Sequence, residues 1–402
     1  MSTGKTCRIC VYPARHPLGL TVDTDGVCSG CRVHLEKDTL EWAPRREKLR
    51  KILDSYRVPD ASRHDCIIPV SGARDSFFIV DLIKNEYGMN PLLVSFNRHY
   101  NTAAGIFNLE QLRSRTGCDM ITLTLNPDVY KRLIRYSVRK MGSIHWPYLA
   151  GSTVFPVQTA VRKKIPLIIW GTHQGVDQVG MFSHLDEVEM TRRYRREHDL
   201  MGVEPEDALV DIGADLKESD LKPLFYPDDE HIEAVGVRGI YLNNYIRWDT
   251  KAQHEMMIAK YDYYTGDQLR TFDTYNDIDC RIFSSLHDDI KRRKWGYGRI
   301  NDHVSREIRL GRLTREEGMA LVTSYIQKGD IMVQEKEFCA WIGMDVSAFQ
   351  AAIAAHARAS SDETPATSKT PVKDLKFICN TPDRMSAKDP NAPRLLMKGE
   401  VD

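Results

Sequence analysis

The chain has 402 residues, of which 42% are hydrophobic and 28% charged, a composition typical of a soluble globular protein with two or more domains. Lysine and arginine number 56, as do aspartate and glutamate, and this zero net charge argues against a protein that binds duplex nucleic acid. No apolar run approaches the ~20 residues that span a bilayer, and the N-terminus lacks an apolar signal-peptide core. We therefore expect a cytoplasmic protein that binds neither membrane nor nucleic acid.

The chain begins with two Cys-x-x-Cys pairs, formed by Cys7, Cys10, Cys28 and Cys31. The 17 residues between the pairs match the spacing of zinc-binding modules, in which each pair makes a tight turn that aims two thiolates at one ion. Four sulfur ligands close the coordination shell, so we predict a structural Zn²⁺ site in a zinc-ribbon-like module of residues 1–45. The alternatives are free thiols or an iron–sulfur cluster. His16 and His34 are then expected to be ordinary surface residues.

Strands and helices alternate after the cysteine pairs. Short apolar runs predict strands at residues 65–70, 92–96, 120–125 and 166–171. Helical spacing of apolar residues predicts helices at residues 45–57, 77–87, 102–117 and 128–141. This alternation indicates an α/β fold with a parallel sheet and helices on both faces, which we assign to a nucleotide-binding domain of residues 46–235.

The rest of the chain has a weaker pattern. Within the predicted domain, residues 172–235 are polar and charge-rich, and we expect them to form an insertion or a substrate-facing segment. Residues 236–355 are expected to form a mainly helical region that contacts a substrate or a partner. Residues 356–402 are rich in Ala, Ser, Thr, Pro and Lys, and are expected to be a disordered tail.

A loop with the features of a phosphate site lies between the first predicted strand and its helix, at Ser71, Gly72, Ala73, Arg74, Asp75 and Ser76. Small residues let backbone amides approach an anion, and the helix N-terminus adds positive charge. The serine hydroxyls can donate hydrogen bonds, Arg74 can pair with phosphate, and Asp75 can hold Mg²⁺ or cap the helix. We predict an ATP site in which Arg74 and Asp75 are catalytic. The alternative is a serine-capped turn.

This loop resembles the SGGxDS signature of the PP-loop ATP pyrophosphatases, which cleave ATP between the α and β phosphates. It lacks the G-x-x-x-x-G-K-[ST] pattern of a Walker loop. Ala73 replaces the second glycine of the signature and adds a methyl group where the backbone benefits from freedom.

Further candidates follow two other strands, because ligands of open α/β sheets lie beyond the carboxyl ends of the strands. Phe96 and Asn97 end the second strand. They are predicted to lie near the adenine and near the base or ribose, or else to be a core phenylalanine and a turn asparagine. His173 and Asp177 follow the fourth strand and are predicted to do acid–base work or to bind substrate. The alternative is a polar loop with a solvated histidine.

The motifs in this order resemble the N-acetyl sugar amidotransferase family over roughly residues 5–350. The resemblance rests on the cysteine pairs and on DCIIPVSGARDS, NPLLVSFNRHYNTAAGIFN, LIIWGTHQGVDQVG, GVRGIYLNNYIRWDTKAQHE and RTFDTYNDIDC. The sequence departs from the family pattern at two places. It has Arg74 where members often have Lys, and Thr172-His173 where many have Glu-Asn. The family loop carries over onto Ser71, Gly72, Asp75 and Ser76.

The resemblance implies an enzyme of bacterial surface-glycan biosynthesis, making lipopolysaccharide O-antigen or flagellin sugars. Such an enzyme converts the acetamido group of a nucleotide-linked sugar into an acetamidino group. ATP adenylates the amide oxygen, and ammonia then displaces AMP. The ammonia is implied to come from glutaminase and cyclase-like partner proteins.

Two other functional classes remain open from the sequence. A tRNA-thiolation enzyme of the PP-loop type needs a reactive cysteine, whereas Cys66 and Cys118 are expected to be buried and inert. A catalytically inactive binding protein that keeps the fold is motivated by Ala73 and by the altered Gly171-Thr172-His173 stretch.

Overall fold

The computed structural model describes residues 6–14, 16–60, 62–72, 75–280, 282–327 and 331–362. The strands are β1 (Cys66–Pro69), β2 (Pro91–Phe96), β3 (Met120–Leu123), β4 (Leu167–Trp170) and β5 (Arg238–Tyr241). The α-helices within the described ranges are α1 (Ser29–Glu36), α2 (Trp42–Tyr56), α3 (Ser76–Asp81), α4 (Ala103–Thr116), α5 (Pro127–Met141), α6 (Trp146–Lys163), α7 (Gln174–Asp177), α8 (Arg192–Tyr194), α9 (Pro205–Ile212), α10 (Glu218–Leu221), α11 (Asp229–Val235), α12 (Thr250–Tyr261), α13 (Asp288–Trp295), α14 (Arg299–Arg309), α15 (Arg315–Gln327), α16 (Met332–Ile342) and α17 (Val346–Asp362).

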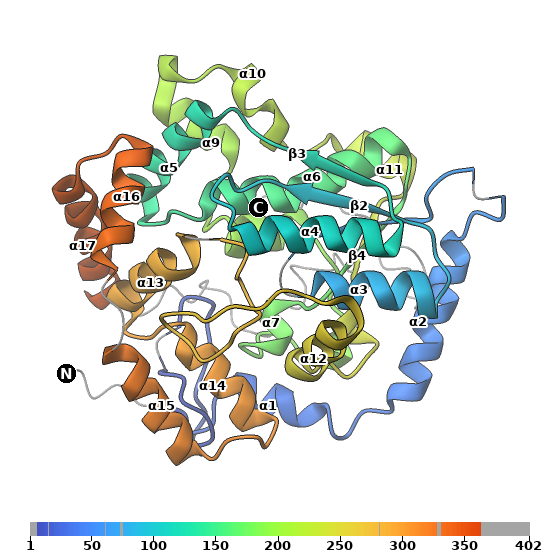
Figure 1. The fold of residues 1–402 in the computed structure, drawn as a ribbon, viewed down its shortest axis with the longest axis horizontal. Coiled ribbons are helices and arrows are strands. Elements are labelled where there is room, and N and C mark those ends of the chain that lie inside the picture. The colour runs from blue at the N-terminus through green and yellow to red at the C-terminus, as the bar shows by residue number, and fades with distance from the viewer. Residues whose placement is uncertain are drawn as a thin grey trace.

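The five strands form one parallel sheet in the order β3-β2-β1-β4-β5 (Figure 1). From β1 the chain adds β2 and β3 on one side and then adds β4 and β5 on the other side. The order therefore reverses between β1 and β4, and in open α/β sheets the carboxyl ends at such a switch point form the ligand crevice. The predicted α/β class with a parallel sheet is confirmed.

Helices cover both faces of the sheet because successive strand residues point to opposite sides. Ile67 and Ile168 belong to a hydrophobic core that includes α5 and α6. Ile68 and Ile169 belong to a second core that includes α2, α3 and α12. All four of these side chains are fully buried, which explains why the strands read as continuous apolar runs.

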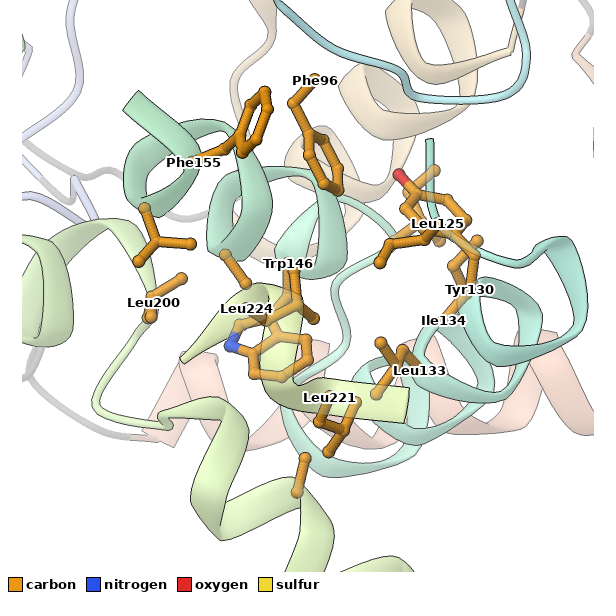
Figure 2. Packing of buried hydrophobic residues seen from close by; sticks show 14 of the residues in the cluster. Phe96, Leu125, Tyr130, Leu133, Ile134, Trp146, Phe155, Leu200, Leu221 and Leu224 are labelled. Atoms are coloured by element: carbon orange, nitrogen blue, oxygen red, sulfur yellow. The ribbon is translucent and has the colours of Figure 1, made fainter. Parts of the chain in front are cut away.

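The predicted elements correspond to β1–β4 and α2–α5, with a π-helical turn (Leu82–Glu86) continuing α3. The 18-residue helix α6 was not predicted. It contains Pro147, Gly151 and Pro156, which resemble helix breakers in a sequence, and it is buried between the sheet and later segments. Figure 2 shows its Trp146 indole close to Leu221 and Leu224.

Residues 236–355 contain the strand β5 besides their helices, and β5 pairs in parallel with β4 and completes the sheet. One prediction for the C-terminal half needs correction. The disordered tail expected from residue 356 is wrong at its start, because α17 continues to Asp362. Residues 363–402 lie outside the described residues. No single described helix is long and apolar enough to cross a membrane, and a pair formed by α16 and α17, bent by 106°, meets the length and composition criteria only when the two are combined.

The N-terminal cysteine module shares its core with the rest of the chain. Cys7, Cys31, Val179 and Tyr297 belong to one hydrophobic cluster, which joins residues from three distant parts of the sequence. The predicted boundary at residue 45 stays a prediction.

The expectation that His16 and His34 lie on the surface is wrong. Their exposed fractions are 2% and 7%, and the His16 ring stacks on Tyr297 with ring centres 5.1 Å apart. Burial lowers the pKa of His16 to about 3 and that of His34 to about 4.

Candidate functional site

The loop after β1 is held against helix α4. Gly72 has a φ of +75°, and a Cβ added there would lie 2.8 Å from the Leu109 amide nitrogen. Any other side chain would therefore meet both backbone strain and a collision, so the position requires glycine. The Ser71 amide donates a hydrogen bond to the Ser76 hydroxyl at 3.2 Å, which closes the loop across the start of α3.

Asp75 lies at the switch point itself. It occupies the position before α3, and its carbonyl accepts a hydrogen bond from the Ile79 amide at 2.9 Å. A Cβ built on Gly171, directly after β4, would lie 3.3 Å from the Asp75 Oδ2 atom. The carboxylate from the β1 loop therefore faces the carboxyl end of β4. Ala73 and Arg74 lie outside the described residues, so the roles assigned to them stay predictions.

His173 is placed as a structural residue in the loop after β4. Its Nδ1 accepts a hydrogen bond from the Gly175 amide at 3.1 Å and caps α7. The ring is 1% exposed and packs 4.3 Å from Tyr194 and 4.7 Å from Tyr241, measured between ring centres. Burial lowers the pKa of His173 to about 3. This environment favours a neutral capping histidine over the solvated alternative, and an acid–base role stays a prediction.

Asp177 pairs with a lysine from the N-terminal module. Its Oδ1 lies 2.5 Å from the Nζ of Lys37, whose side chain is 3% exposed. The Lys37 ammonium also donates to the Trp248 carbonyl at 3.4 Å. Burial alone would raise the pKa of Asp177, but the charge and hydrogen bond of Lys37 outweigh it and lower that pKa. Asp177 is therefore an anion held in place by the first helix.

Phe96 is a core phenylalanine and Asn97 a turn asparagine, which are the alternatives considered for these two residues. A Cβ added to Gly151 of α6 would lie 2.1 Å from the Phe96 ring, so this ring fills the space above the glycine in the core shown in Figure 2. Asn97 organises the turn after β2, since its Oδ1 accepts from the His99 amide at 2.9 Å. Roles near the adenine and the ribose stay predictions.

Two parts of this edge were missed by the sequence analysis. One is Lys37, and the other is a buried ion pair in which the Arg98 Nη2 atom lies 3.2 Å from the Asp279 Oδ2 atom. The Arg98 guanidinium also lies over the Tyr148 ring, 4.1 Å from its centre. A Cβ on Gly105 would lie 2.5 Å from the Cα of Asp279, so the chain at Asp279 packs directly on the start of α4.

The four N-terminal cysteines are gathered as a metal site requires. Their sulfur atoms are buried and all lie within 4.8 Å of one another. The distances between the sulfurs of Cys7 and Cys31 and of Cys10 and Cys28 are 3.9 and 3.7 Å. A tetrahedral ion with Zn–S bonds of about 2.3 Å requires about 3.8 Å between sulfurs.

This spacing favours a single ion. In a four-iron cluster each thiolate binds a different iron, so the sulfurs would stand farther apart. Backbone amides donate to the sulfurs, among them the Cys28 amide to the Cys7 sulfur at 3.3 Å. The donor set and its spacing fit a structural metal ion, and zinc as its identity stays a prediction.

Comparison with known proteins bears on the C-terminal region. Residues 260–372 match the family described as "LPS biosynthesis protein WbpG-like, C-terminal domain". The match covers less than half of the chain and agrees with the predicted link to surface-glycan biosynthesis. Asp279 lies within the matched residues, so this region contributes directly to the edge where β2 ends.

Other likenesses are weaker. Over 120 residues the chain is 24% identical to the uncharacterized protein MJ1599 of Methanocaldococcus jannaschii, and this covers 29% of the chain and 42% of that relative. NMN synthetase from Francisella tularensis has a TM-score of 0.27 at 13% identity, covering 36% of this chain and 60% of its own. The U34-tRNA thiolase NcsA from Methanococcus maripaludis with its [4Fe-4S] cluster has a TM-score of 0.26 at 13% identity, covering 77% of this chain and 87% of its own. Nothing about function follows from such scores.

Proposed function

We propose that the chain is an ATP-dependent, AMP-forming amidotransferase that converts the acetamido group of a nucleotide-linked sugar into an acetamidino group. One observation carries the proposal. The loop after β1, which contains Gly72, places the Asp75 carboxylate next to Gly171 at the end of β4, and this is the switch point of the sheet. The match of residues 260–372 to the WbpG-like family supports a role in lipopolysaccharide or O-antigen biosynthesis.

The chemistry requires an activated leaving group, because the oxygen of an amide leaves poorly. ATP supplies the adenylyl group, which bonds to the amide oxygen while pyrophosphate departs. Ammonia then attacks the amide carbon, AMP leaves with the oxygen, and loss of a proton gives the amidine. The enzyme has to position the reactants and neutralise phosphate charge.

Each part of the site has a task in this scheme. Backbone amides of the Gly72 loop and the Ser76 hydroxyl would bind phosphate oxygens at the N-terminus of α3. The Asp75 carboxylate would hold Mg²⁺, which usually takes one or two carboxylates besides phosphate oxygens. Lys37 fixes the loop after β4 through Asp177. Glutaminase and cyclase-like partners would deliver the ammonia in the cytoplasm, through a route that excludes water.

The test is to incubate the purified chain with ATP, Mg²⁺, ammonium chloride and a panel of UDP-linked di-N-acetylated sugars. The expected result is AMP formed only with sugar, and a product about one mass unit lighter, since an imino group replaces the carbonyl oxygen after phosphoryl activation. AMP that depends instead on tRNA and a sulfur donor would indicate thiolation. No AMP under any condition would indicate a binding protein.

A matched pair of variants links the activity to the proposed site. Asp75→Asn removes the carboxylate at the switch point and is expected to abolish AMP formation while the fold is kept. Asp128→Asn is the control, because Asp128 is likewise an aspartate at the start of a helix, but its side chain is 77% exposed. Equal activity of the two variants would remove Asp75 from the mechanism.

A further inference from the structure

One arginine of the matched residues 260–372 reaches the cysteine centre. Arg309, at the end of α14, places its Nε 3.4 Å from the Cys31 sulfur and its Nη2 3.6 Å from the Cys28 sulfur. Among the described residues, the other donors to these sulfurs are backbone amides and the thiols of the centre itself. Within the described part of the chain, the Arg309 guanidinium is therefore the cationic side chain that donates hydrogen bonds to the cysteine sulfurs.

The same guanidinium binds the loop after β4. Its Nη1 donates to the Gln178 carbonyl at 2.7 Å and to the Asp177 carbonyl at 3.4 Å. Asp177 is the residue whose carboxylate pairs with Lys37. One planar group thus touches the thiolates on one side and the site loop on the other.

The neighbouring backbones make room for this arrangement. A Cβ added to Gly30 would lie 2.3 Å from the Arg309 Nη2 atom and 2.5 Å from the Gln178 carbonyl oxygen. Gly180 has a φ of +65°, and a Cβ there would lie 2.2 Å from the Ser29 carbonyl oxygen. Two glycines at one contact allow α1, the loop and the guanidinium to meet without side chains between them.

Charge explains why an arginine is needed here. Four thiolates around a divalent ion leave a net charge of −2, which is unfavourable when buried without a counter-charge. The Arg309 guanidinium, which donates to the sulfurs of Cys31 and Cys28, supplies that counter-charge. A side chain that hydrogen-bonds to a metal ligand in this way typically changes the affinity of the site for its metal by 10–100-fold.

We propose that Arg309 is a positioning residue that joins the metal centre to the loop after β4, so that metal binding sets the position of that loop. The link to catalysis rests on the proposed function, whereas the coupling between metal and loop does not. When the metal leaves, the cysteine sulfurs are no longer held in one cluster, so Arg309 loses its fixed acceptors and the loop that carries Asp177 loses its anchor.

The experiment uses the full chain purified with Zn²⁺ and compares Arg309→Met, Arg309→Lys and Arg306→Met. Arg306 is one turn earlier on α14 and forms its own ion pairs with Asp273 and Glu307, so its loss controls for removal of a buried arginine. The measurements are the rate of zinc transfer to a chromogenic chelator and hydrogen exchange of residues 173–180.

Arg309→Met is expected to release zinc about 10-fold faster or more and to exchange faster at residues 173–180, with Arg306→Met close to the wild type. Arg309→Lys keeps the positive charge but loses the planar set of N–H donors, so its rates of zinc release and hydrogen exchange are expected to lie between those of the wild type and Arg309→Met. If Arg309→Met does not fold, Arg309→Lys takes its place in the comparison. Unchanged zinc release in both Arg309 variants would overturn the proposal. Chelation of the wild type that leaves loop exchange unchanged would overturn the coupling. Neither readout needs ATP or sugar, so failure here is distinct from failure of the proposed function.

Discussion

Lys37 and Asp177 form an ion pair that connects the end of the first helix to the loop after β4, with 2.5 Å between Nζ and Oδ1. The lysine side chain is 3% exposed and that of the aspartate 24%, so the pair is largely withdrawn from water. Removing one partner leaves a charge that has lost its counter-charge and that water reaches only in part.

Lys37→Met is therefore expected to lower the free energy of unfolding by about 3 kcal/mol. The double variant Lys37→Met/Asp177→Asn is expected to lose less than the sum of the single variants, because no unpaired charge remains. Urea unfolding of all four proteins measures this coupling. Additive losses would show that the contact does not stabilise the fold.

This pair also sets a pH dependence. The pKa of Asp177 is lowered in the folded protein, so its contribution is present above the usual aspartate pKa of about 3.9 and is lost as the pH falls through the folded value. The difference in stability between the wild type and Lys37→Met is expected to be largest near pH 7 and to shrink below about pH 4. Unfolding midpoints at several pH values test the sign.

Gly72→Ala is expected to reduce both stability and ATP turnover. The substitution adds a left-handed backbone penalty of about 1 kcal/mol and a collision with the Leu109 amide. Gly236→Ala is the matched control, because Gly236 has a φ of +71° with nothing within 4 Å of its added Cβ. A larger loss in Gly72→Ala than in Gly236→Ala isolates the close approach of α4. Equal losses would mean that the loop can move away.

Gly151→Ala tests the packing of α6 on the sheet. The new methyl group would meet the Phe96 ring at 2.1 Å, and such overpacking typically costs about 1–3 kcal/mol. Adding Phe96→Leu to the variant is expected to restore part of the stability, because the smaller side chain leaves room. Thermal unfolding of the single and double variants provides the comparison. No rescue would indicate that the helix shifts as a whole.

His173 is expected to remain neutral in the folded protein between pH 7 and pH 5. Burial first, and the nearby His198 second, lower its pKa to about 3, whereas the unfolded chain takes up a proton near pH 6.5. Its contribution to stability is thus complete above that pH and declines as the pH falls toward 3. His173→Asn keeps an acceptor for the Gly175 amide and should lose stability less steeply between pH 7 and 5 than the wild type. His231→Asn, which replaces a histidine whose side chain is 67% exposed, serves as the control.

The cysteine centre is expected to hold one divalent ion per chain. Elemental analysis should find zinc, and substitution with Co²⁺ should give the intense thiolate absorption of a tetrahedral sulfur site. Cys31→Ser is expected to lower metal content and the unfolding temperature together, since structural zinc contributes folding free energy. Iron with inorganic sulfide would instead identify a cluster.

Patterns within short stretches of sequence predicted the strands β1–β4 and the loop at Gly72. The strands β1–β4 are apolar runs bounded by turns, and the loop at Gly72 follows from residue types at fixed spacing. The helix α6 was missed because prolines interrupt a segment that is buried on most sides. The strand β5 was missed because it begins with Arg238 and Gly239, so it lacks the continuous apolar run that marks the other strands.

The contacts that assemble the site were beyond such reasoning. Lys37 and Asp177 are 140 residues apart, and Arg309 and Cys31 are 278 residues apart. These pairs depend on how the helices α1 and α14 dock, which no local pattern encodes. The sequence therefore predicted which segments bear chemistry, whereas the partners of Asp177 and of the cysteines required the structure.

The distance between Arg309 and the cysteines along the chain has a consequence for synthesis. The ribosome finishes the cysteine pairs at residue 31 and must add 278 more residues before the guanidinium exists. At about 5–20 residues per second this takes roughly 15 to 55 seconds. For that time the thiols lack their cationic partner, so the nascent chain passes through an interval in which its first module is open to oxidation or to the wrong metal.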